Sequence, residues 1–170
     1  QPMTWVQSLA ANYTDGILVM HRGRVVYERY FGALRPDGMH IAHSVTKSFA
    51  GTIAAMLVAE GKLDPDAPVS RYLPELQHSG LGDATVRQVL DMTTGIKYSE
   101  AYADPDADVW RFARSASLVP RPAGYTGPAT SYEFLATLAK EGEHGQAFVY
   151  KSPNTEVLGW LIRRVTGQRF

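Results

Sequence analysis

Two short runs of aliphatic and β-branched residues near the N-terminus predict a β-hairpin. They cover residues 16–20 and 25–31, and the short segment 21–24 between them contains Gly23. Because two strands alone do not make a stable sheet, we expect partner strands that these two runs do not supply. The remaining apolar pattern is helical, which makes the chain an α+β protein.

Residues 44–59 show the helical spacing most clearly. Large apolar side chains recur near every third or fourth position among alanines and glycine, which predicts a largely buried helix. Gly61 is a plausible C-cap for it. After the proline-containing turn at 64–68, residues 69–73 predict a short helical piece.

Capping residues predict four further helices, because a Ser, Thr or Asp side chain can accept a hydrogen bond from a free N–H group at a helix start. Proline also favours the first turn. Residues 118–130, rich in proline and glycine, predict an irregular loop before the third of these helices. The predicted helices are 86–92 (capped by Thr85), 105–113 (capped by Asp104), 131–138 (opened by Ser131) and 153–165 (capped by Ser152).

Composition narrows the class of protein. The 170 residues suit one domain, and 17 Lys and Arg balance 17 Asp and Glu, so no basic field favours a nucleic acid or an anionic membrane. The sequence contains no apolar run of about 18 residues, the length that is needed to span a bilayer. The absence of cysteine removes thiolate chemistry, and the five histidines lack metal-ligand spacing, so we expect neither a metal nor a cofactor.

The first eleven residues lack the basic and apolar regions of a secretory signal. This favours a cytoplasmic location for the chain as given, although a signal that has been removed stays open.

Ser44 and Lys47 are the first candidate for chemistry. On a helix, residues i and i+3 share a face and lie within contact distance. A serine hydroxyl is a weak nucleophile until a base takes its proton, and a neutral lysine amine can be that base. The alternative is a helix-capping serine with a solvated lysine. His43 cannot readily serve Ser44, since neighbouring helical residues point about 100° apart; we interpret it as structural or as a pocket wall.

A second polar cluster, Tyr150-Lys151-Ser152-Pro153-Asn154, stands at the start of the last predicted helix. Together with the Ser-x-x-Lys helix, with Gly61-Lys62-Leu63-Asp64 and with Thr93-Thr94-Gly95, it makes nearly the whole chain resemble the penicillin-recognising serine hydrolases. These are the class C β-lactamases, the D-alanyl-D-alanine carboxypeptidases and related esterases. Within them, the stretches 131–135 and 150–158 look most like the 6-aminohexanoate-dimer (nylon oligomer) hydrolases.

The resemblance implies a role for each candidate residue. Ser44 would be the acylated nucleophile, Lys47 its base, and Tyr150 the proton shuttle to the leaving amine or alcohol. Ser152 and Asn154 would help to orient them. The resemblance also implies that Tyr102 closes over the substrate, against the alternative of an ordinary loop or core aromatic residue.

The same resemblance implies a β-lactamase/transpeptidase-like fold. Residues 1–43 would supply the hairpin part of its α/β lobe, and residues 44–170 the nucleophile helix and a mainly helical lobe. Family members continue with strands that complete the sheet and supply the second N–H donor of the oxyanion hole, which is typically worth about 3 to 4 kcal/mol. We therefore expect an N-terminal fragment that is poorly active alone and whose partner is the remaining C-terminal part of the fold.

The function expected from this resemblance is a serine hydrolase. Its substrate would be a small amide of the linear 6-aminohexanoate oligomer type or a short-chain ester. The alternatives are a D-alanyl-D-alanine peptidase or a β-lactamase, which penicillins should trap covalently, a non-catalytic ligand-binding member of the fold, and a purely structural fragment. Whether the chain forms a homodimer is left open.

Overall fold

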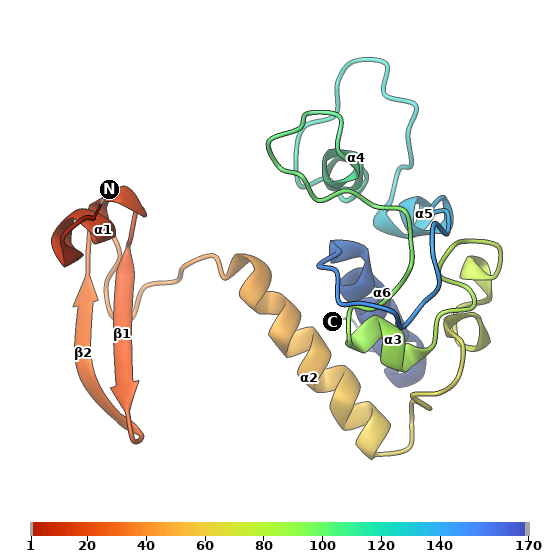
Figure 1. Cartoon of the computed structure of the whole chain (residues 1–170), viewed down its shortest axis with the longest axis horizontal. Helices are drawn as coiled ribbons and strands as arrows, with labels where there is room; N and C mark the ends of the chain where they lie inside the picture. Colours follow the sequence, from red (N-terminus) through yellow and green to blue (C-terminus); the bar gives the residue numbers. More distant parts are fainter. Residues whose placement is uncertain (1, 169–170) are drawn as a thin grey trace. The chain divides into compact units, whose positions relative to one another are not determined.

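The computed structural model describes residues 2–168 and divides the chain into two compact units, Gln1–His43 and Ser44–Phe170. Figure 1 shows a small unit built on one hairpin and a larger unit built from helices and loops. No helix in the described residues is both long and apolar enough to cross a membrane.

The first unit contains helix α1 (Trp5–Ala11) and the strands β1 (Gly16–His21) and β2 (Arg24–Tyr30), which pair antiparallel. The turn between the strands is Arg22-Gly23, both with positive φ (50° and 77°), which matches the right-handed twist of the strands. Trp5 packs edge-on against Tyr27 of β2, with ring centres 6.3 Å apart. The predicted hairpin is therefore confirmed.

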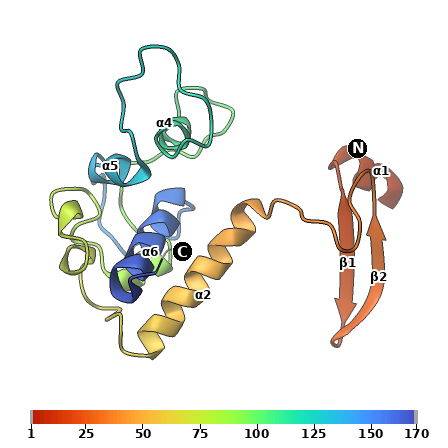
Figure 2. The same ribbon diagram turned by 180° about the vertical axis from the view of Figure 1, so that it is seen from behind.

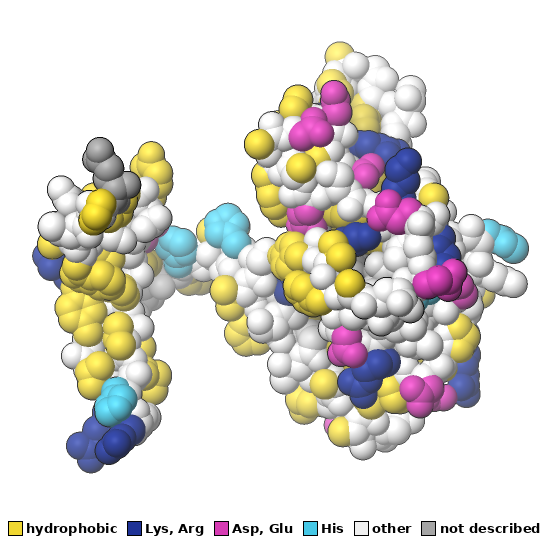
Figure 3. All heavy atoms as spheres, viewed as in Figure 1, with side chains coloured by type: hydrophobic (Ala, Val, Ile, Leu, Met, Phe, Trp, Pro, Cys, Tyr) yellow, Lys and Arg dark blue, Asp and Glu magenta, His cyan; other side chains and the backbone are white. Residues whose placement is uncertain are grey.

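The hairpin leaves much of its apolar surface exposed, as the yellow side chains along it show (Figure 3). Leu18, Val19 and Met20 of β1 are between 41% and 59% exposed, and Val25 and Val26 of β2 are similarly open. Within the residues that the structure describes, this sheet has two strands.

The second unit is helical. A single 3₁₀ turn, η1 (His43–Val45), leads into α2. The elements that follow are α2 (Thr46–Ala59), the 3₁₀ turns η2 (Val69–Arg71) and η3 (Pro74–Leu76), α3 (Val86–Leu90), α4 (Asp108–Ser115), α5 (Ser131–Ala136) and α6 (Ser152–Thr166). Helices α2 and α6 pack side by side, as both ribbon views show (Figures 1 and 2), and α3 lies against α6.

One apolar core joins these elements. Apolar residues from α3, α5, α6 and the loops between them are fully or almost fully shielded from solvent. Its largest fully buried side chains are Phe134, Leu63, Leu73, Leu76, Leu81, Ile96, Leu135 and Leu161.

The prediction that the helix over 44–59 is largely buried is wrong for the described residues. Only Ala50, Ala54 and Leu57 of α2 are buried, because these small or inward-facing positions form the face that packs on α6. Phe49 and Met56, on the rest of the helix surface, are 63% and 56% exposed.

Of the four predicted helix starts, those at Val86 and Ser131 were right, and those capped by Asp104 and Ser152 were wrong. Thr85 caps α3 with a complete capping box to Gln88. Asp104 does not cap α4: its carboxylate accepts the Asp106 N–H within a turn, and the helix begins only at Asp108. Ser152 is the first residue of α6 rather than its cap, because its hydroxyl donates to a carboxylate elsewhere in the unit.

Among the remaining predictions, the end of α5 differs in detail, and the Gly61 C-cap and the irregular loop are confirmed. Thr130, one residue before the predicted start, caps α5, and that helix ends at Ala136 instead of continuing to residue 138. Gly61 follows the last turn of α2 with φ of +70°, as a C-cap glycine should. Residues 118–130 contain no helix or strand, as predicted.

Candidate active site

Ser44 and Lys47 meet at the start of α2. Lys47 Nζ lies 3.0 Å from Ser44 Oγ, one helical turn apart. The cap position of α2 is Val45, which makes no side-chain capping bond, so the hydroxyl of Ser44 is not used to cap this helix. Ser44 is exposed to solvent, whereas the Lys47 side chain is partly shielded from it.

Tyr150 completes this cluster from a position 106 residues later. Its hydroxyl donates a hydrogen bond of 2.8 Å to Ser44 Oγ. Lys47 Nζ also lies 5.2 Å from the centre of the Tyr150 ring, within the range of a cation–π contact. One serine oxygen therefore lies within hydrogen-bonding distance of an amine and a phenol, while the Tyr150 side chain stays 38% exposed.

Tyr150 is held in place by backbone hydrogen bonds between two loop segments, residues 92–97 and 139–149. The Val149 N–H donates to the carbonyl of Met92 (3.0 Å), and the Gly145 N–H donates to that of Thr93 (2.7 Å). The two segments also pair through an isolated bridge between Ile96 and Lys140. These bonds fix the backbone on the N-terminal side of Tyr150, and on its C-terminal side the chain enters α6, which packs on α2.

Gly95 and His144 fix the same pair of segments. A Cβ at Gly95 would overlap the carbonyl oxygen of Gly142, so only glycine allows this close approach. The Gly95 N–H donates to Nδ1 of His144 (2.8 Å), which leaves the proton of the neutral ring on Nε2, where Asp83 accepts it (2.9 Å). His144 therefore joins the two segments with both of its ring nitrogens occupied.

Lys151 and Asn154 support the site from within the core. The buried Lys151 amine donates to the carbonyl of Ile96 and to Glu141 (3.2 Å to the carboxylate). Asn154 is fully buried, and its side-chain oxygen accepts the Thr94 hydroxyl (2.7 Å). The structure thus places Asn154 in the core, bonded to Thr94, and shows no hydrogen bond from its side chain to Ser44, Lys47 or Tyr150 among the described residues.

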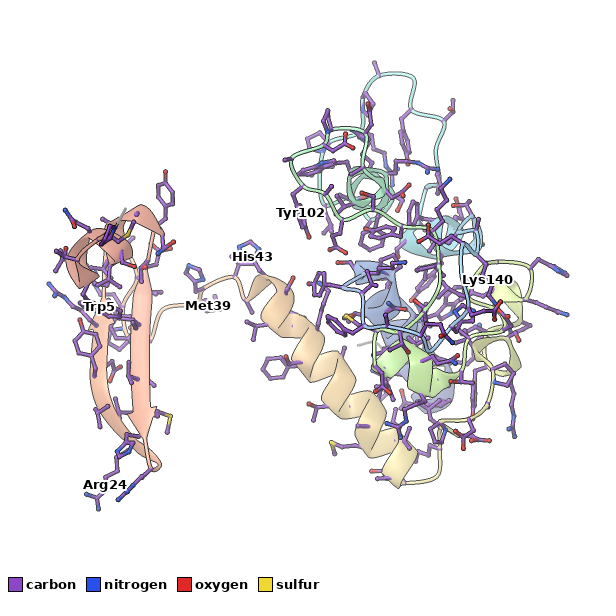
Figure 4. All side chains as sticks on the ribbon, in the orientation of Figure 1. Trp5, Arg24, Met39, His43, Tyr102 and Lys140 are labelled. Atoms are coloured by element: carbon purple, nitrogen blue, oxygen red, sulfur yellow. The ribbon has the colours of Figure 1, made fainter. Side chains whose placement is uncertain are left out.

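Glu100 connects two other predicted residues. Its carboxylate accepts the backbone N–H of Ser152 (2.8 Å), the hydroxyl of Ser152, and the hydroxyl of Tyr102 (2.8 Å). Partial burial and the Glu100 carboxylate raise the pKa of Tyr102 to about 12, so its hydroxyl stays protonated as a donor. Tyr102 stands in the loop ahead of α4 (Figure 4), and its ring makes a T-shaped contact with that of Trp110, with ring centres 6.0 Å apart.

The structure therefore brings together Ser44, Lys47 and Tyr150, and it links Tyr102 to Ser152 through Glu100. His43 is the last residue of the first unit, and its φ of +44° is strained for a non-glycine residue directly before Ser44. In the described part of the chain no three His, Asp or Glu side chains gather as metal ligands would.

Comparison with known proteins adds the family. The β-lactamase family matches residues 6–170. The chain belongs to the β-lactamase family. Among curated proteins, it is 43% identical over 164 residues to the 6-aminohexanoate-dimer hydrolase of Paenarthrobacter ureafaciens, which covers 96% of this chain and 41% of that protein. It is 28% identical to the esterase EstB of Burkholderia gladioli, over 89% of this chain and 40% of the esterase.

Solved structures agree with this assignment. A Bacillus anthracis protein described as a candidate 6-aminohexanoate-dimer hydrolase superposes with a TM-score of 0.87 at 31% identity, over 98% of this chain and 44% of that one. The fold is thus the β-lactamase-like fold that the sequence predicts. The chain spans about two fifths of the length of the curated relatives that it matches.

Within this β-lactamase-family chain, sequence reasoning missed Glu100 and His144 as parts of the site's framework. Glu100 bonds to Ser152 across 52 positions, and no local spacing signals that contact. The histidines lack metal-ligand spacing, and no local pattern indicates that His144 pairs with the Gly95 backbone and the Asp83 carboxylate.

Proposed function

We propose that this protein is a serine hydrolase that cleaves small linear amides or short-chain esters through an acyl-enzyme on Ser44. The observation that carries the proposal is the placement of Lys47 Nζ and the Tyr150 hydroxyl at 3.0 Å and 2.8 Å from the same Ser44 oxygen. Nucleophile and base within hydrogen-bonding reach are the geometric signature of nucleophilic catalysis.

In the proposed reaction, the proton of Ser44 passes to a neutral Lys47 amine while Oγ bonds to the substrate carbonyl carbon. The carbon–nitrogen or carbon–oxygen bond then breaks. The leaving group takes the proton of the Tyr150 hydroxyl, and Lys47 passes the proton that it received from Ser44 to Tyr150. Water next attacks the ester on Ser44, its proton returns through the same groups to Oγ, and the carboxylic acid is released.

The substrate class is supported by the relatives. The relative that is 43% identical is named for the 6-aminohexanoate dimer, a linear amide, and another is named an esterase. Since one acyl-transfer site can serve both bonds with modest changes in pocket contacts, we propose the linear amide as substrate and short-chain esters as side substrates.

Labelling with a fluorophosphonate tests the nucleophile. In the full-length protein, intact-mass spectrometry should find one adduct, formed as Ser44 Oγ bonds to phosphorus and fluoride leaves. Ser44→Ala should give none, and Lys47→Ala should react about 10²- to 10⁴-fold more slowly because the base is lost. Ser48→Ala and Lys62→Ala, on the same helix and just beyond it, are matched controls that should react normally.

Absence of an adduct on the folded wild-type protein would contradict the proposal and favour a non-catalytic ligand-binding role. An adduct that persists in Ser44→Ala would show that another residue is the nucleophile.

Substrate assays test the proposed substrate class. Chromatography of the linear 6-aminohexanoate dimer and absorbance assays with p-nitrophenyl esters should both show turnover that depends on Ser44. Incubation with benzylpenicillin should leave the mass unchanged. A stable penicilloyl adduct, or rapid hydrolysis of the penicillin, would instead favour a D-alanyl-D-alanine peptidase or a β-lactamase.

A further inference from the structure

Tyr150 sits between two anchored points of the backbone. On its N-terminal side, the Val149 N–H is bonded to the Met92 carbonyl (3.0 Å). On its C-terminal side, the Ser152 N–H is bonded to the Glu100 carboxylate (2.8 Å). The position of the Tyr150 hydroxyl at Ser44 therefore depends on both anchors, together with the buried Lys151 side chain, which is bonded to the Ile96 carbonyl and to Glu141.

Glu100 also does what a helix cap normally does. The residue before α6, Lys151, makes no side-chain capping bond, so the first N–H of the helix would otherwise lack a partner. Glu100 supplies the acceptor from a distant loop, and its negative charge lies at the helix end where the macrodipole favours it. The start of α6 is thereby fixed to the loop that carries Tyr102.

Three donors converge on this one carboxylate: the N–H and hydroxyl of Ser152, and the hydroxyl of Tyr102. An ionised carboxylate has acceptor sites for all three, whereas an amide has one oxygen and an NH₂ group that itself donates. The ionised carboxylate of Glu100 is thus specifically suited to join these groups, and it is half-buried where it does so.

We propose that Glu100 is a positioning residue for the reaction at Ser44: it fixes the start of α6, and so the Tyr150 hydroxyl at the nucleophile, and it ties the Tyr102 loop to the same point. The inference rests on the proposed function. It assigns to Glu100 no contact with the substrate; its effect on the labelling rate is exerted through Tyr150.

The test compares the rate of fluorophosphonate labelling of Ser44 in full-length Glu100→Gln with that in the wild type. Loss of a bond from Glu100 to Ser152 should misplace Tyr150 and slow labelling by about 10- to 100-fold. Glu100→Asp, which keeps the charge but has a shorter reach, should be intermediate. Glu133→Gln is the matched control, since Glu133 likewise accepts a backbone N–H, that of Ala129 (2.8 Å), near the start of α5.

A double-mutant cycle separates positioning from general support of the fold. If Glu100 acts through Tyr150, Glu100→Gln should slow labelling little further in a Tyr150→Phe background. An equal fold-change in both backgrounds would overturn the inference, as would wild-type labelling by Glu100→Gln.

If Glu100→Gln does not fold, Ser152→Ala removes one of the three hydrogen bonds while keeping the carboxylate. Labelling of Ser152→Ala at the wild-type rate would then overturn the inference, and slowed labelling would support it. Failure of the wild type itself to form an adduct would refute the proposed function, so the two failures are distinguishable.

Discussion

His144 shows how one side chain can hold two loop segments together. Its ring accepts a hydrogen bond from the Gly95 backbone and donates one to the Asp83 carboxylate. The Lys140 amine donates to the same carboxylate (2.6 Å), so Asp83, Lys140 and His144 form one cluster. Lys140 is labelled in Figure 4, in the segment that follows α5. The cluster therefore fastens the segment that leads to Tyr150.

This cluster makes acid stability depend on Asp83. Hydrogen bonds from Lys140 and then His144 hold the pKa of Asp83 at about 2, below its ordinary value of 3.8. Because the folded-state pKa is the lower one, the carboxylate stabilises the fold above pH 3.8, and this contribution is lost as the pH falls towards 2. Exposure of Asp83 to solvent keeps the contribution small.

Urea unfolding of wild type and Asp83→Asn measures this effect. The wild type should be more stable at neutral pH, and the difference in the free energy of unfolding should shrink as the pH is lowered through this range. Asp66→Asn, in an exposed turn, is the control. A difference between wild type and Asp83→Asn that stays constant down to pH 2 would contradict the assignment.

Single residues differ in how well the sequence reveals them. The pairing of Ser44 with Lys47 is local, so its spacing of three positions predicted the contact. Glu100 and His144 carry no such signal for the contacts that join the loops, because Ser152 and Gly95 lie 52 and 49 positions away from them. Their roles depend on which loops the fold brings together, and that is a tertiary property.

At the scale of elements, caps were predictable only where no other group competes for the side chain. Thr85 caps α3 because its hydroxyl has Gln88 as a local partner. Ser152 has the right chemistry for a cap, but Glu100 takes its hydroxyl. Asp104 is similarly used within its own turn, which delays α4 to Asp108.

Because the two loop segments touch at Gly95, we expect alanine substitutions at Gly95 and at Gly142 to affect the stability of the fold differently. Gly95→Ala would drive a methyl group into the Gly142 carbonyl and should destabilise the fold by about 1–3 kcal/mol, as overpacking does. Gly142→Ala is the matched control: nothing lies within 4 Å of its added methyl, so stability should change little.

Thermal or urea unfolding of the two variants checks this expectation. Equal stability of Gly95→Ala and Gly142→Ala would show that the segments separate without cost. A loss confined to Gly95→Ala, accompanied by slower labelling of Ser44, would connect this backbone contact to the placement of Tyr150.

At the scale of the whole molecule, the sequence was sufficient for the α+β class, the hairpin and most helices, since these follow from local periodicity and turn chemistry. It was insufficient for the burial of α2. Phe49 and Met56 have the composition of core residues, yet in the described chain only the small-residue face of that helix is packed, against α6. Periodicity shows which positions are apolar but not which neighbours cover them.

The 106-residue separation of Ser44 and Tyr150 has a kinetic consequence. Contacts between distant parts of a chain close large loops and tend to form late in folding, after local helices. In refolding from urea, far-ultraviolet circular dichroism should therefore recover before the capacity of Ser44 to react with a fluorophosphonate. Simultaneous recovery of the two signals would contradict this order. If the two signals recover in the expected order, nucleophilic reactivity reports completed folding, and a partly folded chain does not react with the fluorophosphonate.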